Sequence, residues 1–303
     1  MSISYIEPVF RPPSEWKSLI LQVTNGCSWN KCTFCDMYTS ESKKFRPKKI
    51  DQIEQEIIDV AKSGKTTRRV FLADGDAMML PFNRLKEILT LIKQHLPQVT
   101  RVSSYCLPRN LTNKTVEQLS ELCALGLKLM YVGCESGDDE ILALIEKGET
   151  YQSSLIALNK IKQAGMKSSV MILNGLGGPE LSRQHALNSA KLMNEAQPDY
   201  LSTLVVSFPL GEERFAKQFF DGSRELLRQP FRQLTQRELF VEMEYLLSAL
   251  ELRKTIFRSD HASNYLVLKG VLGKDKGVLL DQVLQALKEP EAVTLREEWQ
   301  RGL

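Results

Sequence analysis

The sequence predicts an α/β fold, an incomplete barrel of six parallel strands with helices between them, followed by a mainly helical C-terminal extension. The first observation is an alternation of short apolar or β-branched segments with amphipathic helical segments, which runs from Leu19 to Phe208. The second is a glycine at the end of three of the helical segments, each followed shortly by the next predicted strand. The third is the clustering of polar and small residues after the strands, where a parallel barrel carries its chemistry.

The six strands are predicted at residues 19–24, 70–73, 102–105, 129–133, 170–173 and 201–207. The helices between them repeat apolar residues with the period of an α-helix, as at Ile50, Ile53 and Ile57. Gly64, Gly126 and Gly165 end three of these helices, because glycine readily adopts the left-handed conformation that stops a helix. Parallel strands joined by right-handed crossovers then give a partial, TIM-like (β/α)6 barrel.

Three segments make up the predicted domain organisation: a lead-in over residues 1–17, the partial barrel over 18–210, and an extension over 211–303 that caps the barrel. The extension contains helical patterns at residues 212–257 and 276–287, with a polar segment at 258–265 between them. No stretch has the composition of a linker.

The composition is that of a globular protein, with 303 residues, 43% hydrophobic, 25% charged and a mean hydropathy of -0.23. The net charge of +3 neither argues for a nucleic-acid partner nor excludes one. We find no signal peptide and no apolar run of the roughly 20 residues that a membrane span needs. We therefore expect a cytoplasmic protein without a membrane partner, whose six cysteines stay reduced.

Three of these cysteines, Cys27, Cys32 and Cys35, lie within nine residues, and no nearby cysteine or histidine completes a set of four ligands. Three thiolates can hold three irons of a cubane cluster and leave the fourth open for chemistry. The other cysteines are isolated and are expected in the core; they are Cys106, Cys123 and Cys134.

This motif, with an aromatic residue, Phe34, before the last cysteine, resembles that of the radical S-adenosylmethionine (SAM) superfamily. The first gap, from Ser28 to Lys31, is one residue longer than in the commonest form of the family. The same spacing begins a plant-type ferredoxin ligand set, and a zinc-binding module is a further alternative. Both need a fourth ligand, and the next cysteine is the distant Cys106.

The resemblance implies two cofactors, a [4Fe-4S] cluster on Cys27, Cys32 and Cys35, and SAM. In the family, a glycine-containing segment after the second strand offers backbone carbonyls to the amino group of SAM. Residues 73–77 stand at that place here, and the expected contacts are Ala73, Asp74, Gly75 and Asp76. A simple turn between strand and helix is the alternative, to which Gly and Asp are equally suited.

Residues 132–138 resemble the strand-four segment of the branch that contains oxygen-independent coproporphyrinogen oxidases and methylthiotransferases. There a polar residue contacts the ribose or the methionine carboxylate, which implies a role for Glu135 or Ser136, although Ser136 could instead cap the next helix. Gly175 and Gly177 resemble the segment beside adenine, or form an ordinary loop. Ser103 and Ser104 face opposite sides of a strand, and we favour Ser104 as the inward one.

The resemblance further implies that the reduced cluster cleaves SAM to a 5'-deoxyadenosyl radical, which abstracts hydrogen from a substrate. We expect a small metabolite, for example a tetrapyrrole-like one, with an RNA-modifying enzyme as the alternative. An electron donor such as flavodoxin or ferredoxin is implied as a partner. No acid or base can be assigned from the sequence.

Four further polar residues have open roles in the sequence. Lys43 belongs to a basic run at residues 43–49 that either touches an anionic group of the substrate or is solvated. His261 and Asn264 either close the substrate cavity or form structural hydrogen bonds, and His185 is expected to be structural.

Overall fold

The computed structural model describes residues 3–64, 66–208, 211–219 and 231–302. The chain divides into two compact units. The first comprises Met1–Asn30, Met37–Gly133 and Ile156–Ser168, and the second Lys31–Asp36, Cys134–Leu155 and Ser169–Leu303. In each unit the strands are mostly parallel and alternate with helices, which confirms the predicted α/β class.

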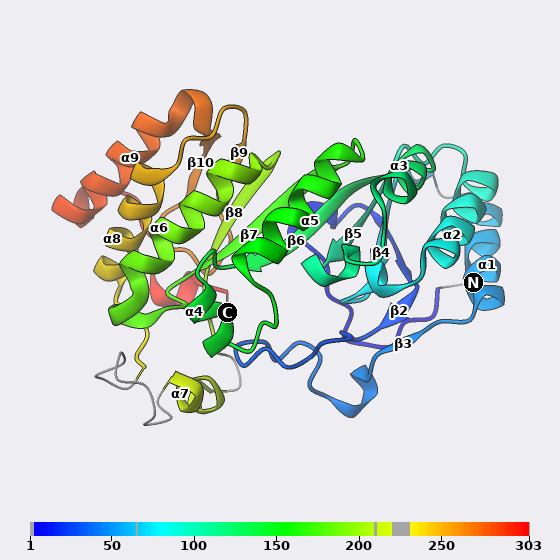
Figure 1. Ribbon diagram of the computed structural model, residues 1–303, viewed down its shortest axis with the longest axis horizontal. Helices are drawn as coiled ribbons and strands as arrows, with labels where there is room; N and C mark the ends of the chain where they lie inside the picture. The colour runs from blue at the N-terminus through cyan, green and yellow to red at the C-terminus, as the bar shows by residue number, and fades with distance from the viewer. Residues whose placement is uncertain (1–2, 65, 209–210, 220–230, 303) are drawn as a thin grey trace. The chain divides into compact units, whose positions relative to one another are not determined.

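The first unit carries parallel strands in the order β1 (Leu19–Gln22), β4 (Arg69–Ala73), β5 (Arg101–Cys106) and β6 (Leu127–Glu135). Its helices are α1 (Ile50–Lys62), α2 (Phe82–His95) and α3 (Val116–Ala124), which Figure 1 shows side by side near β4 and β5. A short antiparallel pair, β2 (Thr24–Asn25) with β3 (Arg46–Pro47), brackets the loop that contains the three cysteines.

In the second unit, β7 (Lys167–Asn174), β8 (Tyr200–Val205) and β9 (Ile256–Ser259) are parallel neighbours, and β10 (Leu268–Val271) is antiparallel to β9. Its helices are α4 (Asp139–Leu144), α6 (Gly178–Ala196), α7 (Glu213–Phe219), α8 (Gln236–Ala249) and α9 (Leu272–Lys288), while α5 (Tyr151–Gln163) has residues in both units. Helix α8 packs against α6 and α9. The chain also contains short 3-10 helices: η1 (Pro13–Glu15), η2 (Glu41–Lys43), η3 (Ala77–Met79), η4 (Pro108–Leu111), η5 (Pro290–Ala292) and η6 (Glu298–Gln300).

All six predicted strands are present within a few residues of their expected ends. The three helix-ending glycines have the expected positive φ, of 70° at Gly64, 112° at Gly126 and 75° at Gly165. The extension differs from the prediction because it supplies β9 and β10 as well as helices. In the expected helical stretch 212–257, α7 and α8 are observed, and residues 220–230 lie outside the described residues.

The lead-in residues pack on the first unit. The Tyr5 hydroxyl donates to the Ile20 carbonyl at 2.9 Å, and the Ile6 amide donates to Gln22 Oε1 at 2.8 Å. Val9 packs against the cluster that contains Ile20 and Phe71. These residues therefore cover one face of the first unit's strands.

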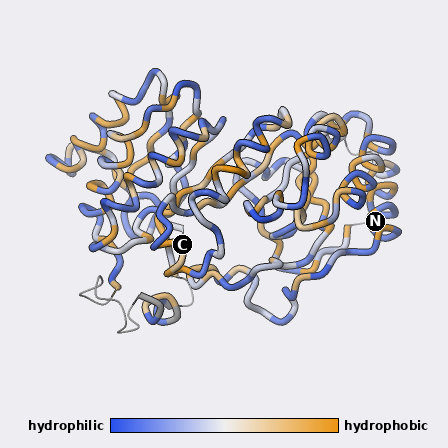
Figure 2. Tube along the Cα trace, in the orientation of Figure 1, coloured by the Kyte–Doolittle hydropathy of each residue, from blue (hydrophilic) through white to orange (hydrophobic). Residues whose placement is uncertain are grey.

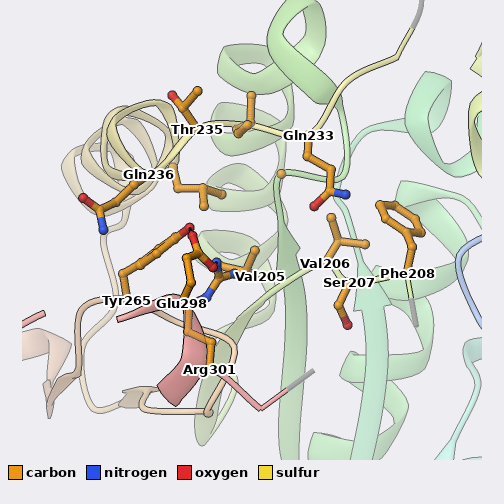
Figure 3. A pocket seen from close by; sticks show the side chains of 13 residues that line it. Val205, Val206, Ser207, Phe208, Gln233, Thr235, Gln236, Tyr265, Glu298 and Arg301 are labelled. Atoms are coloured by element: carbon orange, nitrogen blue, oxygen red, sulfur yellow. Dashed lines mark hydrogen bonds and ion pairs between the residues drawn. The ribbon is translucent and has the colours of Figure 1, made fainter. Parts of the chain in front are cut away.

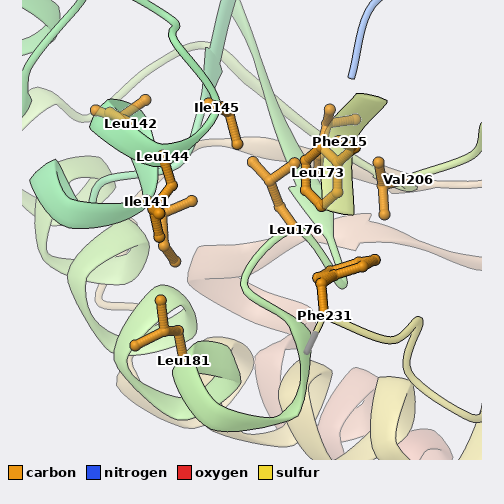
Figure 4. Packing of buried hydrophobic residues seen from close by; sticks show 10 residues of the cluster. All are labelled: Ile141, Leu142, Leu144, Ile145, Leu173, Leu176, Leu181, Val206, Phe215 and Phe231. Atoms are coloured by element: carbon orange, nitrogen blue, oxygen red, sulfur yellow. The ribbon is translucent and has the colours of Figure 1, made fainter. Parts of the chain in front are cut away.

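The second unit has its own apolar cluster, which joins α4 to β7 and α7. Figure 4 shows Leu144, Leu173 and Phe215 among its buried members. The helices alternate hydrophobic and hydrophilic residues along their length (Figure 2), as expected for helices that bury one side.

Candidate functional site

The three clustered cysteines are half-buried. Cys27 follows β2 in the first unit, whereas Cys32 and Cys35 belong to the second. Before Cys27, Gly26 has a φ of 70°, and a Cβ there would lie 1.9 Å from the Lys43 carbonyl oxygen. Glycine is thus required for the close approach of the chain after the motif. Among the described residues, no group of three or more His, Cys, Asp and Glu side chains is gathered to hold a metal ion.

The segment between Cys32 and Cys35 is fixed by short-range and tertiary contacts. The Cys35 amide donates to the Cys32 carbonyl at 3.2 Å, and the Thr33 amide donates to the Ile145 carbonyl at 3.0 Å. Phe34 packs against the apolar cluster of the second unit. The aromatic residue of the motif therefore anchors the cysteine loop to residues that follow α4.

Glu135 and Lys147 form a buried ion pair in the same unit, with 3.0 Å between Lys147 Nζ and Glu135 Oε1 and side-chain exposures of 10% and 4%. The Lys147 ammonium also lies 5.8 Å from the centre of the Phe34 ring. Burial alone would lower the pKa of Lys147, but the Glu135 carboxylate and the Cys32 and Cys35 thiols outweigh it and raise that pKa. Lys147 is therefore a cation beside the two thiols.

The second oxygen of Glu135 is buried and has no hydrogen-bond partner among the described residues. Glu135 ends β6 with a φ of 64°, a conformation unusual for a residue other than glycine. A buried carboxylate oxygen without a donor costs free energy. This oxygen could accept a donor from a bound molecule, and the contact of Glu135 with SAM stays a prediction.

The Ser136 hydroxyl forms hydrogen bonds within the protein. It lies 2.8 Å from His185 Nδ1 and accepts the Asp138 amide at 3.0 Å. His185 Nε2 lies 2.9 Å from the Leu173 carbonyl oxygen, so the buried histidine is structural, as expected. The cap of α4 is Asp138, whose side chain accepts the Ile141 amide. Ser136 is thus neither the helix cap nor open to a ligand in this arrangement, and a role in SAM binding remains a prediction.

Asp74, predicted in the SAM-contacting segment, lies in a buried polar cluster of the first unit. Lys43 Nζ is 2.7 Å from Asp74 Oδ2, with both side chains 0% exposed, and also donates to the Ile6 carbonyl at 2.5 Å. The Tyr38 hydroxyl donates to Asp74 Oδ1 at 3.2 Å. Gly75 is needed beside it, because a Cβ there would lie 2.5 Å from the Tyr38 ring. Within the basic run at residues 43–49, Lys43 is therefore buried and paired inside the protein, whereas Lys44, Arg46 and Lys49 are exposed, as the solvated alternative expects.

Asp76, two residues later, is also fully buried and accepts hydrogen bonds from the Ser28 amide at 3.2 Å and from the Ser28 hydroxyl. Burial raises the pKa of Asp76, and the bonds from Ser28 oppose the rise. Ser28 directly follows Cys27, so Asp76 ties the segment predicted to bind SAM to the start of the cysteine motif. Ala73, the residue before Asp74, is the buried last residue of β4.

Ser103 and Ser104 belong to β5 and lie on opposite faces of its strand, as expected. Phe71, Tyr105 and Tyr131 share one face of the strands, in edge contacts with ring centres 5.1 to 6.3 Å apart, and Val9 covers that face. Side chains alternate along a strand, so Ser103 shares the face of Tyr105 and Ser104 lies opposite. The Ser104 hydroxyl donates to the Leu72 carbonyl at 3.1 Å. Ser104 therefore lies on the face opposite the three aromatic rings, and its contact with SAM stays a prediction.

The glycine-rich segment after β7 is held by a buried carboxylate. Gly175 has a φ of 84°, and its amide donates to Glu242 Oε1 at 2.6 Å. The Ser182 hydroxyl donates to the other oxygen of Glu242 at 2.6 Å. Burial raises the pKa of Glu242. Gly177 is packed tightly instead, since a Cβ there would lie 2.9 Å from Ile141 Cδ1.

A pocket of about 480 Å³ opens at the ends of β7 and β8 (Figure 3). Gly175 lines it, together with Val205, Val206 and residues of the extension. His261 and Asn264, the two residues considered for closing a cavity, instead form internal hydrogen bonds: His261 Nδ1 lies 2.9 Å from the Ser263 hydroxyl, and Asn264 Nδ2 donates to the Thr203 carbonyl at 2.8 Å. The pocket-lining residue of this segment is Tyr265.

The sequence profile of the Radical SAM superfamily matches residues 21–193. The chain belongs to the radical SAM superfamily. It is 26% identical over 165 residues to 4'-phospho-dehydrooxetanocin synthase of Priestia megaterium, covering 49% of this chain and 22% of that protein. It is 22% identical over 180 residues to the heme chaperone HemW of Bacillus subtilis (strain 168), covering 57% of this chain and 47% of that one. The chain thus spans less than half the length of these relatives.

The solved structure of coproporphyrinogen III oxidase (HemN) from Escherichia coli matches with a TM-score of 0.55 and 19% identity, over 76% of this chain and 52% of that one. A structure of anSMEcpe with bound AdoMet matches with a TM-score of 0.56 and 16% identity, over 76% and 59% of the two chains. These likenesses confirm the partial-barrel fold.

Membership of the superfamily makes the protein an enzyme that uses a [4Fe-4S] cluster and SAM. The residues fit these groups, because the motif offers three thiols and no fourth ligand, and Glu135 keeps a buried oxygen for a donor. Within the described part of the chain, no helix is long and apolar enough to cross a membrane.

Sequence reasoning did not indicate that three charged side chains of the candidate site are buried: Lys147, Lys43 and Glu242. Each is a charged side chain that is buried with a partner distant in sequence. Charged residues are usually exposed, so a single sequence contains no signal that these three are not.

Proposed function

We propose that this protein cleaves SAM reductively at a [4Fe-4S] cluster held by Cys27, Cys32 and Cys35, and abstracts hydrogen from a small organic substrate. When bound, the cluster and SAM supply the electron and the 5'-deoxyadenosyl radical for this reaction. The observation that carries the proposal is the buried Glu135–Lys147 pair beside Cys32 and Cys35, with one carboxylate oxygen lacking a donor.

The protein's own residues would bind and orient the cofactor. Glu135 Oε2 would accept hydrogen bonds from hydroxyl groups such as those of a ribose, while Lys147 holds the carboxylate in place. Lys147 also balances negative charge at the neighbouring thiolates. The backbone of residues 73–76 and of Gly175 would approach the amino group and the adenine, respectively. Phe34 and the apolar cluster behind it would exclude water from this side.

The partner that supplies electrons is proposed to be a small redox protein such as flavodoxin or ferredoxin. A small-molecule substrate is favoured by the pocket of about 480 Å³ at the ends of β7 and β8, which is within the size range of small-molecule sites. Steeply salt-dependent binding of bulk tRNA would instead support an RNA substrate, since phosphate contacts release counterions.

The test is anaerobic reconstitution with iron and sulfide, followed by reduction in the presence of SAM. We expect about four irons per chain and production of 5'-deoxyadenosine. Cys32→Ala should lose both, whereas Cys123→Ala, at a buried cysteine outside the motif, should keep both. Production of 5'-deoxyadenosine that does not depend on Cys32 would refute the proposal.

The role of Glu135 is tested separately by equilibrium dialysis of SAM against reconstituted protein. Glu135→Gln keeps the size of the side chain but removes the charge that pairs with Lys147. SAM should bind about tenfold more weakly or worse, because a hydrogen bond to a charged group contributes about 1.5–3 kcal/mol. Unchanged binding at full iron content would exclude Glu135 from the SAM site.

A further inference from the structure

Three side chains of the C-terminal extension meet in the pocket at the ends of β7 and β8: Tyr265, Glu298 and Arg301 (Figure 3). Glu298 belongs to η6, and Arg301 follows it directly. All the residues that line this pocket belong to the second unit. The cluster therefore borders a cavity of the right size for a metabolite.

Two donors of this cluster point at one carboxylate. Arg301 Nη1 lies 2.7 Å from Glu298 Oε2, and the Tyr265 hydroxyl donates to Glu298 Oε1. Arg301 is fixed from two other sides, because its Nε donates to the Ser263 carbonyl at 2.9 Å and its guanidinium lies 3.8 Å from the centre of the Tyr265 ring. The guanidinium and the phenol thus form a preorganised receptor for a carboxylate.

The receptor and the carboxylate differ in their burial. The Arg301 side chain is 8% exposed and Tyr265 is 8% exposed, whereas the Glu298 side chain is 71% exposed. An ion pair with one well-solvated partner contributes little to stability. Replacement of the Glu298 carboxylate by another carboxylate would therefore cost little, while the two buried donors stay in place.

We propose that Arg301 and Tyr265 recognise a carboxylate group of the substrate, and that Glu298 occupies this place in the absence of substrate. The inference rests on the proposed function, since it names the substrate class of the same enzyme: a small molecule with a carboxylate and an apolar portion. The apolar portion is indicated by Val205, Val206 and Leu239, which line the rest of the pocket.

The test uses apo protein, so it does not depend on the iron-sulfur cluster or on SAM cleavage. Benzoate and benzamide serve as probes, because they share size and apolar ring and differ in the charge of the polar group. Trp299, next to Glu298 and 81% exposed, reports release of the Glu298 segment through its fluorescence. Trp299→Phe provides the background from the other two tryptophans. We expect saturable quenching by benzoate and none by benzamide.

The variants separate recognition from simple structural support. Arg301→Gln should weaken benzoate binding by about tenfold or more, since it removes a charge-assisted hydrogen bond. Glu298→Gln should strengthen binding, because it removes the competing carboxylate. A purely structural ion pair predicts weaker binding, or none, in both variants. That result, or equal binding of benzamide, would overturn the inference.

The outcome is independent of the radical reaction. Benzoate binding without production of 5'-deoxyadenosine by the reconstituted enzyme would leave the carboxylate site standing and refute the proposed function. Production of 5'-deoxyadenosine without selective benzoate binding would refute only the carboxylate site.

Discussion

The buried ion pair between Lys43 and Asp74 gives the sharpest prediction about stability. Both side chains are 0% exposed, and Lys43 Nζ lies 2.7 Å from Asp74 Oδ2. Lys43→Met keeps the length and much of the volume of the side chain but removes its charge. The Asp74 carboxylate then stays buried without a cation, with the Tyr38 hydroxyl at 3.2 Å and the Phe10 amide at 3.4 Å as its remaining donors.

Loss of one partner of a buried ion pair costs about 3–5 kcal/mol, because it leaves an uncompensated charge in a medium of low dielectric constant. The two remaining donors are long, so they stabilise the carboxylate only weakly. We therefore expect Lys43→Met to lower the free energy of unfolding by about 3 kcal/mol or more. That is a large part of the roughly 5–15 kcal/mol typical of a folded protein.

The measurement is urea unfolding of the apo protein, followed by far-UV circular dichroism. Lys44→Met is the matched control, because Lys44 is the next residue, is 77% exposed and lies 3.9 Å from Glu41; its unfolding midpoint should not change measurably. The double variant Lys43→Met/Asp74→Leu should recover much of the loss, since it removes both charges. Equal midpoints for Lys43→Met and Lys44→Met, or no recovery in the double variant, would refute the reasoning.

Three further predictions concern the second unit. Asp138→Ala removes the cap of α4 and should lower the free energy of unfolding by about 1 kcal/mol, whereas Asp138→Asn, which can still cap, should lose less. Glu242→Gln leaves an acceptor for the Gly175 amide but disturbs the hydrogen bond with the Ser182 hydroxyl. It should lower the free energy of unfolding in urea by about 1–3 kcal/mol, and an unchanged midpoint would contradict this. Burial and the bond to Glu298 raise the pKa of Tyr265 to about 12 from 10.0, so its contribution to stability is complete below pH 10 and should be lost as pH rises towards 12. Tyr265→Phe should remove that part of the alkaline loss, as measured by thermal unfolding against pH.

Much of the fold could be predicted because its signals are local. Each of the six strands is a short apolar or β-branched segment, and each of the three helix-ending glycines has a neighbouring strand that it introduces. Strands β9 and β10 were missed because their short segments have mixed polar and apolar composition. Their pairing depends on β8, which lies far away in sequence.

The candidate site also has a part that the local sequence predicts and a part that depends on tertiary contacts. Cys27, Cys32 and Cys35 lie within nine residues, so their spacing predicts a [4Fe-4S] cluster site without any knowledge of the fold. The partner of Glu135 is Lys147, and helix α4 lies between them in the chain. Ser136, in contrast, forms hydrogen bonds with His185 and with the Asp138 amide, which no local pattern indicates.

The sequence by itself determined the superfamily of this protein and predicted its cluster ligands, because ligand type, ligand number and spacing are local properties of the chain. Only the tertiary structure decided which polar side chains are buried and with whom they pair. Lys43, Glu135 and Glu242 illustrate the difference. Each is a charged side chain that is buried against a residue from another segment of the chain. The physical reason is that the cost of burying a charge depends on the whole environment in the folded state, which residue type alone does not specify.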